Sequence, residues 1–310
     1  MKKLLILLLV CSVSITGFSQ TIMNSTPEAA GFSSERLKRL DNAMNEWVEK
    51  GYMNGGAALI IRDGKIAYYK ANGYNDLDTK APLQKDGIFR IASQTKAITS
   101  VAIMMLFDEG KLLLTDPVSL YIPSFKKQGV MVNFNPADTT YTTVPAKREV
   151  TIKDLLTHTS GLGYAQIGSK EANAIYAKSN ITAGLGVKDR TLLSAMSRLG
   201  EMPLMHQPGE KFTYGLNTDV LGCLVEVISG VSLEEFFRTR IFEPLGMKDT
   251  YFNLPQAKAN RLVNLYTETP QGKLVKANAG MLNSVATTNY PLVPHTYYSG
   301  GAGLSSTIYD

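Results

Sequence analysis

The sequence predicts an α+β protein, in which an antiparallel sheet is flanked by helices and accompanied by a helical lobe at about residues 110–250. The sheet is indicated by two β-rich runs, 57–62 and 65–72, joined by Asp63-Gly64, a dipeptide typical of a tight hairpin turn. The helices are indicated by apolar residues repeated at helical spacing and by capping residues that precede them. Because a lone hairpin is only marginally stable, further strands or a helix must pack on it.

Two helices illustrate these signals. Ser33 or Ser34 can cap an amphipathic helix in the first part of the chain, and Asn217 or Thr218 can cap the apolar helix 219–229. In both cases a polar residue stands directly before the apolar repeat. A side-chain oxygen at that position can accept a hydrogen bond from the free backbone N–H groups of the first turn.

The composition is that of an ordinary soluble globular protein. Of the 310 residues, 44% are hydrophobic and 19% are charged, which is ample for a core. The chain has no internal repeat, low-complexity tract or charge block, so residues 21–310 are expected to form one domain. The net charge of +5 falls to +3 (5 − 2) when Lys2 and Lys3 of the leader are left out. A charge this small and scattered argues against a nucleic-acid partner.

Residues 1–20 have the pattern of a signal peptide. Lysines precede an apolar run that is too short to span a membrane, and small and polar residues follow. We expect cleavage near Ser19 or Gln20, export to the periplasm or the exterior, and no membrane span. A lipoprotein anchor through Cys11 is disfavoured, because Val10 is bulky at a position where processing needs a small side chain.

The cysteines and histidines predict neither a disulfide nor a metal site. With Cys11 in the leader, Cys223 is left alone and is interpreted as a small buried residue on an apolar helix. The three histidines, His158, His206 and His295, are far apart in the sequence, and none lies in a cluster with metal-ligand spacing. We therefore expect no metal and no cofactor.

The candidate chemistry lies in residues 89–110. This stretch predicts a short strand, then Ser93, then a helix so apolar that we expect it to be buried on nearly every face. Lys96 is the only fully charged side chain between Thr95 and Phe107, and it stands three residues after Ser93, within side-chain reach on a helix. A lysine held in an apolar place can accept the proton of a serine hydroxyl and activate it as a nucleophile. The free N–H groups at the start of the helix can stabilise an oxyanion.

The Ser-x-x-Lys pattern is weak evidence by itself, because two common residues at a fixed offset recur by chance. Ser124 and Lys127 match it equally well, yet they lie in a polar loop with nothing to bury the lysine. The structural alternative for Ser93 is a helix cap followed by a lysine that reaches solvent. Other nucleophile systems are less well supported, since the chain has no Gly-x-Ser-x-Gly elbow. His158 is interpreted as a residue that bonds the backbone at a helix end.

A set of motifs resembles the serine β-lactamase and penicillin-binding-protein superfamily, and within it the class C-like serine hydrolases that include many esterases. The resemblance covers most of the chain from about Pro27, and it implies a β-lactamase/DD-peptidase-like fold. The motifs, in the order of the family, are Ile88-Phe89-Arg90-Ile91-Ala92-Ser93-Gln94-Thr95-Lys96, Asp108-Glu109-Gly110-Lys111, Asp116-Pro117-Val118, Leu155-Leu156-Thr157-His158-Thr159-Ser160-Gly161-Leu162, Pro208-Gly209-x-x-Phe212-x-Tyr214, Asp219-Val220-Leu221-Gly222, Pro244-Leu245-Gly246-Met247 and Gly300-Gly301-x-Gly303-Leu304-Ser305-Ser306-Thr307.

The resemblance implies a role for each matching residue. Ser93 would be the acylated nucleophile, Lys96 its helper base, and Tyr214 the tyrosine that shuttles a proton to the leaving group and activates the deacylating water. The reaction would be a two-step acyl transfer through an acyl-enzyme. Asn217 and Gly301 are further candidates for substrate contact. The substrate would be a small-molecule ester, a β-lactam or a peptide; we favour a carboxylesterase, with a β-lactamase or D-Ala-D-Ala-type peptidase as the alternative.

Two departures from the family pattern bear on this interpretation. The second motif of the lactamases is Tyr-x-Asn, whereas this chain has Tyr214-Gly215-Leu216-Asn217, and its one true Tyr-x-Asn, Tyr52 to Asn54, precedes the nucleophile. This difference favours an esterase, and Asn217 is expected to cap a helix. The third motif, Lys-Thr-Gly or an equivalent, does not occur before Asp310. We therefore expect a truncated sequence that lacks C-terminal strands, leaves the hairpin with an exposed edge, and could be a non-catalytic binding protein.

Overall fold

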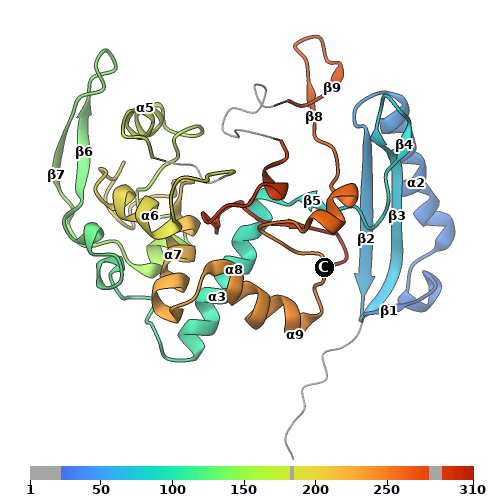
Figure 1. Ribbon diagram of the computed structural model, residues 1–310, viewed down its shortest axis with the longest axis horizontal. Helices are drawn as coiled ribbons and strands as arrows, with labels where there is room; N and C mark the ends of the chain where they lie inside the picture. Colours follow the sequence, from blue (N-terminus) through green and yellow to red (C-terminus); the bar gives the residue numbers. More distant parts are fainter. Residues whose placement is uncertain (1–21, 182–184, 279–287) are drawn as a thin grey trace, which may run out of the picture.

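The computed structural model describes residues 22–181, 185–278 and 288–310. The predicted leader, residues 1–20 with Cys11, lies outside these described residues. Figure 1 shows a sheet with helix α2 on one side of the molecule, a helical lobe on the other side, and α3 with short strands between them. The α+β class predicted from the sequence is confirmed.

Strands lie near both ends of the described chain, and helices dominate its middle. The helices are α2 (Ser34–Glu49), α3 (Thr95–Asp108), α4 (Ile152–Leu156), α5 (Lys170–Lys178), α6 (Leu192–Gly200), α7 (Asn217–Ser229), α8 (Leu233–Phe237) and α9 (Glu243–Leu245). The strands are β1 (Met23–Asn24), β2 (Gly55–Arg62), β3 (Lys65–Asp76), β4 (Ala81–Pro82), β5 (Phe89–Arg90), β6 (Gly129–Phe134), β7 (Tyr141–Pro145), β8 (Tyr266–Glu268), β9 (Leu274–Lys276) and β10 (Ser305–Ser306).

The hairpin predicted from Asp63-Gly64 is confirmed. β2 and β3 pair in antiparallel fashion along their length. Asp63 and Gly64 have φ angles of 51° and 71°, the left-handed conformation that a two-residue turn of this kind needs. β3 lies between β2 and β1, and β4 also pairs with it. Among the described strands β2 pairs with β3 alone, so one edge of the sheet has no strand partner.

Helix α2 covers one face of this sheet (Figure 1). Its cap is Ser33, one of the two predicted residues, whose side chain accepts a hydrogen bond from the amide of Arg36. In the middle of the helix, Asp41 accepts hydrogen bonds from Tyr68 Oη at 2.5 Å and from Lys70 Nζ at 2.7 Å, both on β3. The helix is thereby held to the sheet by charge-assisted bonds as well as by apolar packing.

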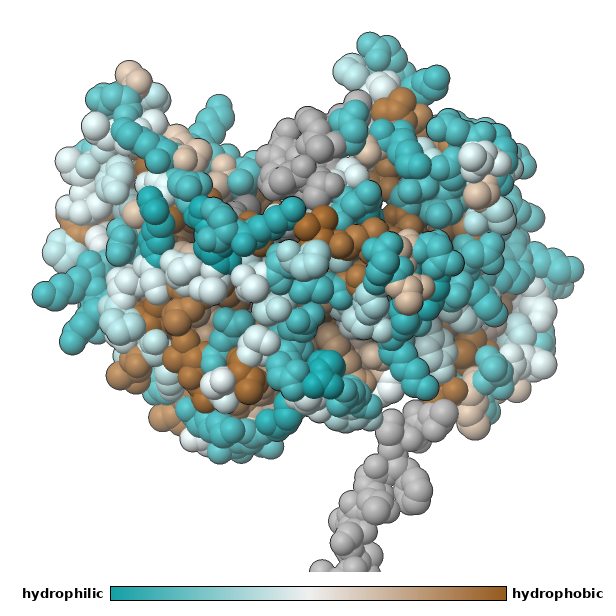
Figure 2. Space-filling view, in the orientation of Figure 1, coloured by the Kyte–Doolittle hydropathy of each residue, from teal (hydrophilic) through white to brown (hydrophobic). Residues whose placement is uncertain are grey.

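Helix α7 is the centre of the helical lobe. It contacts α3, α4, α6 and α8, and each of its residues from Asn217 to Val225 is buried. The β6–β7 hairpin extends from the lobe at the far edge of the molecule (Figure 1). In the same orientation, hydrophilic residues cover most of the surface, while hydrophobic residues gather over the lower part of the helical lobe (Figure 2). Because α7 is enclosed, it gives α3 a rigid surface to pack on.

Helix α3 is less buried than its sequence predicts. Only one face is enclosed, and the buried residues on it are Thr95, Thr99, Ala102, Ile103 and Leu106. A different face of the helix is between 38% and 50% exposed at its three large apolar residues, Val101, Met104 and Phe107. Since no part of the described chain covers them, the prediction of burial on nearly every face is wrong. No described helix is long and apolar enough to cross a membrane.

Candidate active site

Ser93 lies at a sharp turn between β5 and α3. β5 is fixed by antiparallel pairing with β10. Ala92 has a φ of 45°, an uncommon left-handed conformation for a residue other than glycine. Ser93 follows it in the 3₁₀ turn Ala92–Gln94, directly before the first turn of α3. Backbone strain of this kind is characteristic of positions where a fold presents a functional side chain, and Ser93 is exposed here.

Three side chains converge at Ser93. Its Oγ lies 2.6 Å from Tyr214 Oη, and either atom can donate the hydrogen bond. Lys96 Nζ donates to Ser93 Oγ at 3.2 Å and lies 4.7 Å from the centre of the Tyr214 ring. The structure therefore places the three predicted catalytic residues within contact of one another, although Tyr214 is 121 residues from Ser93 in the sequence.

The glycine-rich segment 299–304 lies along the other side of Lys96. Lys96 Nζ donates a hydrogen bond to Gly301 O at 2.7 Å. One helical turn later, Thr99 Oγ1 donates to Gly300 O at 2.7 Å. The first turns of α3 and this segment are thus joined by two short bonds. Gly301 is part of the site through its backbone carbonyl, and its contact with a substrate stays a prediction.

The ring of Tyr214 is held between other rings. His158 stacks on it with ring centroids 5.1 Å apart and planes 22° apart, and Tyr164 lies against it at 5.5 Å. Burial, and then the charge of Lys96, lower the pKa of His158 to about 4, so its imidazole is neutral near pH 7. Tyr214 therefore has one positive charge beside it, that of Lys96, and not a second one from His158.

The structure agrees with the sequence interpretation of His158 and corrects that of Asn217. His158 bonds the backbone at the end of α4, where its amide donates to Leu155 O at 3.2 Å, and its ring also bonds a side chain, with Asn217 Nδ2 at 3.0 Å from His158 Nδ1. Asn217 was expected to cap α7, yet the N-cap is Leu216, without a side-chain cap. The amide of Asn217 is fully buried and also accepts a bond from Ser160 Oγ. It orients His158, and a substrate could reach it only if these bonds broke.

Asp219 is a residue of the site that the sequence reasoning missed. Its carboxylate is 1% exposed and accepts a hydrogen bond from Ser299 Oγ at 2.7 Å. Burial raises the pKa of Asp219 to about 6, although hydrogen bonds from Ser299 and Gly301 and the charge of Lys96 oppose that rise. The available signal was an acidic residue in the first turn of a mostly apolar helix, because acidic residues are rarely buried unless they have partners.

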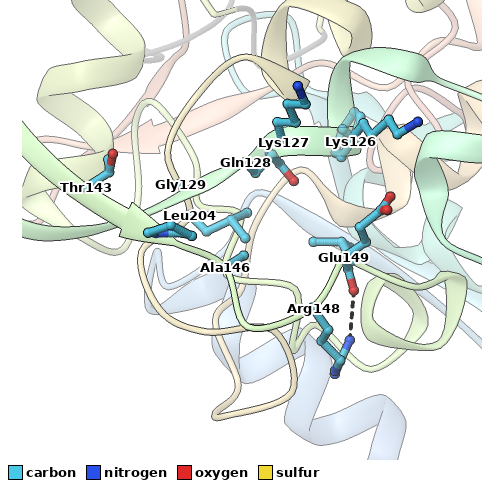
Figure 3. A pocket seen from close by; sticks show the side chains of 12 residues that line it. Lys126, Lys127, Gln128, Gly129, Thr143, Ala146, Arg148, Glu149 and Leu204 are labelled. Carbon is cyan, nitrogen blue, oxygen red and sulfur yellow. Dashed lines mark hydrogen bonds between the residues drawn. The ribbon is translucent and has the colours of Figure 1, made fainter.

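A pocket of about 650 Å³ lies in another part of the helical lobe, between the 3₁₀ turn Pro123–Lys127 and the β6–β7 hairpin (Figure 3). Lys126 and Lys127 at its rim are exposed, and Arg148 donates a hydrogen bond to Glu149 O at 3.0 Å. The side chain of Arg148 also forms an ion pair with Asp154. None of the proposed catalytic residues lines this pocket.

Metal and thiol chemistry have no visible site in the part of the chain that the structure describes. There, no group of three or more His, Cys, Asp or Glu side chains could hold a metal ion. Cys223 is a free thiol buried on α7, as predicted. Burial raises the pKa of this thiol strongly, which keeps it protonated and unreactive near neutral pH.

Comparison with known proteins identifies the family. The Beta-lactamase family model matches residues 40–310. The chain belongs to the Beta-lactamase family. Esterase EstB of Burkholderia gladioli is 34% identical to this chain, and the match covers 88% of this chain and 67% of EstB. Protein Rv1367c of Mycobacterium tuberculosis is 33% identical over 86% of the chain and 63% of its own length, so the chain spans less than two thirds of that relative.

Solved structures agree with this assignment. EstCE1, described as a hydrolase with promiscuous acyltransferase activity, superposes with a TM-score of 0.76 at 27% identity, and the match covers 91% of this chain and 70% of EstCE1. The β-lactamase/DD-peptidase-like fold that the sequence motifs implied is therefore confirmed.

Proposed function

We propose that this protein is a serine hydrolase that cleaves small carboxylic esters through an acyl-enzyme on Ser93. The observation that carries the proposal is the convergence of Ser93 Oγ with Tyr214 Oη at 2.6 Å and with Lys96 Nζ at 3.2 Å. These distances are those at which a side chain can take a proton from a nucleophile. The similarity to Esterase EstB and to the hydrolase EstCE1 supports the same class of reaction.

In the acylation step, Ser93 Oγ attacks the ester carbonyl carbon, and the Lys96–Tyr214 pair takes its proton at the Tyr214 oxygen, which acts as a phenolate beside the cationic Lys96. The pair returns that proton to the oxygen of the leaving group as the carbon–oxygen bond breaks, so that an alcohol departs and the acyl group stays on Ser93. The positive charge of Lys96 lies over the Tyr214 ring and favours negative charge there during the transfer.

In the deacylation step, a water molecule attacks the acyl carbon from the exposed side of Ser93. The same pair takes a proton from this water and donates it to Ser93 Oγ as the acid is released. The neutral His158 ring keeps Tyr214 in place throughout the cycle. The step needs no atom from outside the ester, the water and the three side chains.

The preference for esters follows from the second motif. The asparagine that lactamases have two residues after the tyrosine is replaced by Leu216, and Asn217 is buried against His158 and Ser160. A side-chain amide that could hold a peptide or β-lactam is therefore missing from this position. A β-lactamase or D-Ala-D-Ala-type peptidase is the alternative, followed by a non-catalytic binding protein. We also propose export of the protein, on the basis of the signal-peptide pattern in residues 1–20.

The proposal is tested with p-nitrophenyl esters and a fluorophosphonate probe. We expect a burst of p-nitrophenol followed by steady turnover, and covalent labelling of Ser93 identified by mass spectrometry. Ser93→Ala should abolish both, while Ser124→Ala, which alters the other Ser-x-x-Lys match, should retain both. Stable acylation by penicillin without ester turnover would favour the peptidase alternative. Absence of any covalent adduct in the wild-type protein would refute the mechanism.

A further inference from the structure

We propose that Asp219 is a positioning residue that holds the Gly301 peptide, and through that peptide Lys96, in the geometry needed for proton transfer. The inference rests on the proposed function and adds to it a residue that touches none of the reacting atoms. Asp219 is a buried acidic group that takes no part in the acylation and deacylation steps described above.

The Gly301 peptide lies between two opposite charges. On one side it lies against the carboxylate of Asp219, whose Oδ2 is 2.4 Å from the position that a Cβ of Gly301 would take, and on the other its C=O accepts from Lys96 Nζ at 2.7 Å. An anion on one side of a peptide and a cation at its C=O polarise the peptide and strengthen the hydrogen bond to the cation. The position of Lys96 relative to Ser93 therefore depends on a carboxylate that Lys96 does not contact directly.

The Gly301 peptide packs closely against the side chain of Asp219. A Cβ atom added to Gly301 would lie 2.4 Å from Asp219 Oδ2, so only glycine allows the peptide to approach the carboxylate this closely. Ser299 Oγ donates to the other carboxylate oxygen, Oδ1, at 2.7 Å, and Ala302 N donates to Ser299 Oγ at 3.1 Å. Asp219 thus organises the segment on both sides of Gly301.

The charge of Asp219 is matched to its surroundings. The titratable groups that face it are Lys96 from α3, Tyr164 from the loop after α4, and Tyr297 from the last segment of the chain, with Tyr214 next to Tyr164. Burial raises the pKa of Tyr164 and of Tyr297 strongly, so both phenols are neutral when Asp219 ionises. Lys96 is then the cation that balances the carboxylate. Because the pKa of Asp219 is raised to about 6, we expect this balance to be lost as the pH falls through that value.

The test measures the pH dependence of Ser93 phosphonylation by the fluorophosphonate probe, in which fluoride leaves, and of p-nitrophenyl ester turnover. In Asp219→Asn we expect kcat to fall about 10- to 100-fold with KM changed less than about threefold, because a small displacement of a catalytic group has effects of this size. The fall in activity below about pH 6 should also disappear from the profile. In Ser299→Ala the loss of one donor should move this fall to higher pH.

The matched control is Asp154→Asn. Asp154 is also a buried carboxylate with charged and hydroxyl donors, but it lies in α4 and contacts Arg148. We expect this variant to lose stability and to keep the wild-type pH profile.

An Asp219→Asn protein with wild-type kcat and pH profile would overturn the positioning role. If Asp219→Asn is unfolded by circular dichroism, Ser299→Ala decides: a shifted profile supports the role, and an unshifted one overturns it. No reaction of the wild-type protein would overturn the proposed function, and the positioning role with it.

Discussion

Ser93 with Lys96 and Ser124 with Lys127 have the same sequence pattern and opposite environments. Lys96 donates to Ser93 Oγ and to the carbonyl of Gly301. Lys127 is exposed at the end of a 3₁₀ turn, and Ser124 Oγ is shielded from solvent and has no hydrogen-bond partner among the residues that the structure describes. The offset of three residues is shared, so it cannot be the source of the difference.

What separates the two regions is the set of partners that come from elsewhere in the chain. Tyr214 and Gly301 reach the first pair from positions 121 and 205 residues away from the residues that they bond. Within the described part of the chain, no such partner bonds Ser124. Activating a serine as a nucleophile therefore requires groups from distant parts of the chain. The Ser-x-x-Lys pattern contains only two of the residues that take part.

The largest expected effect comes from the two lysines. We predict that Lys96→Ala lowers kcat for p-nitrophenyl esters by about 10²- to 10⁴-fold, the usual contribution of a group in general acid–base catalysis, while Lys127→Ala leaves kcat within about twofold. Steady-state kinetics of the two purified variants measure the difference. Equal losses in both variants would mean that the distant partners of Lys96 are unimportant.

The next effect concerns Tyr214, the partner that Ser124 lacks. Tyr214→Phe removes only the hydroxyl that lies 2.6 Å from Ser93 Oγ, and we expect kcat to fall about 10²-fold with the fold intact. Tyr52 belongs to the one true Tyr-x-Asn match and is exposed. Tyr52→Phe should leave kcat unchanged. Wild-type turnover in Tyr214→Phe would show that Lys96 serves Ser93 alone.

A smaller effect is expected at Gly301. In Gly301→Ala the new methyl group would meet Asp219 Oδ2 at 2.4 Å, so the peptide must move and its bond to Lys96 lengthen. We predict a loss of about tenfold in kcat, measured with the same esters. Gly110→Ala is the control, because its Cβ meets nothing within 4 Å although its φ is 69°. It should lower the melting temperature without lowering kcat.

The smallest effect is a pH dependence of stability at His158. Its pKa is lowered from 6.5 to about 4 in the folded protein, so below pH 6.5 the unfolded chain binds more protons at this residue than the folded one. Stability from the neutral ring is therefore present above pH 6.5 and is lost as the pH falls towards 4. The free energy of unfolding of the wild type minus that of His158→Gln, from urea titrations, should decrease over this window. A constant difference would contradict the burial of the ring.

The features that follow from neighbouring residues could be predicted from the sequence. The Asp63-Gly64 turn adopts the left-handed angles that its residues favour, and Ser33 caps α2 as its hydroxyl allows. Lys96 reaches Ser93 because only three positions separate Ser93 in the 3₁₀ turn from Lys96 in the first turn of α3. The order of motifs also indicated the family, and through it the role proposed for Tyr214.

The features that depend on packing between distant segments could not be predicted in this way. Asn217 was expected to cap α7, but its amide bonds His158 because α4 and α7 lie together. The apolar pattern of α3 could not show which face α7 would cover.

The sequence by itself thus determined the hairpin, the helix cap and the Ser93–Lys96 pair, since each depends on residues within a few positions of one another. Only the tertiary structure decided that Tyr214, Gly301 and Asp219 surround that pair, and that Ser124 has no comparable partners in segments 22–181, 185–278 and 288–310. The physical reason is that burial, charge balance and the close approach of backbone segments arise where α3, α7 and segment 299–304 meet. These three segments are separated from one another by 70 residues or more along the chain.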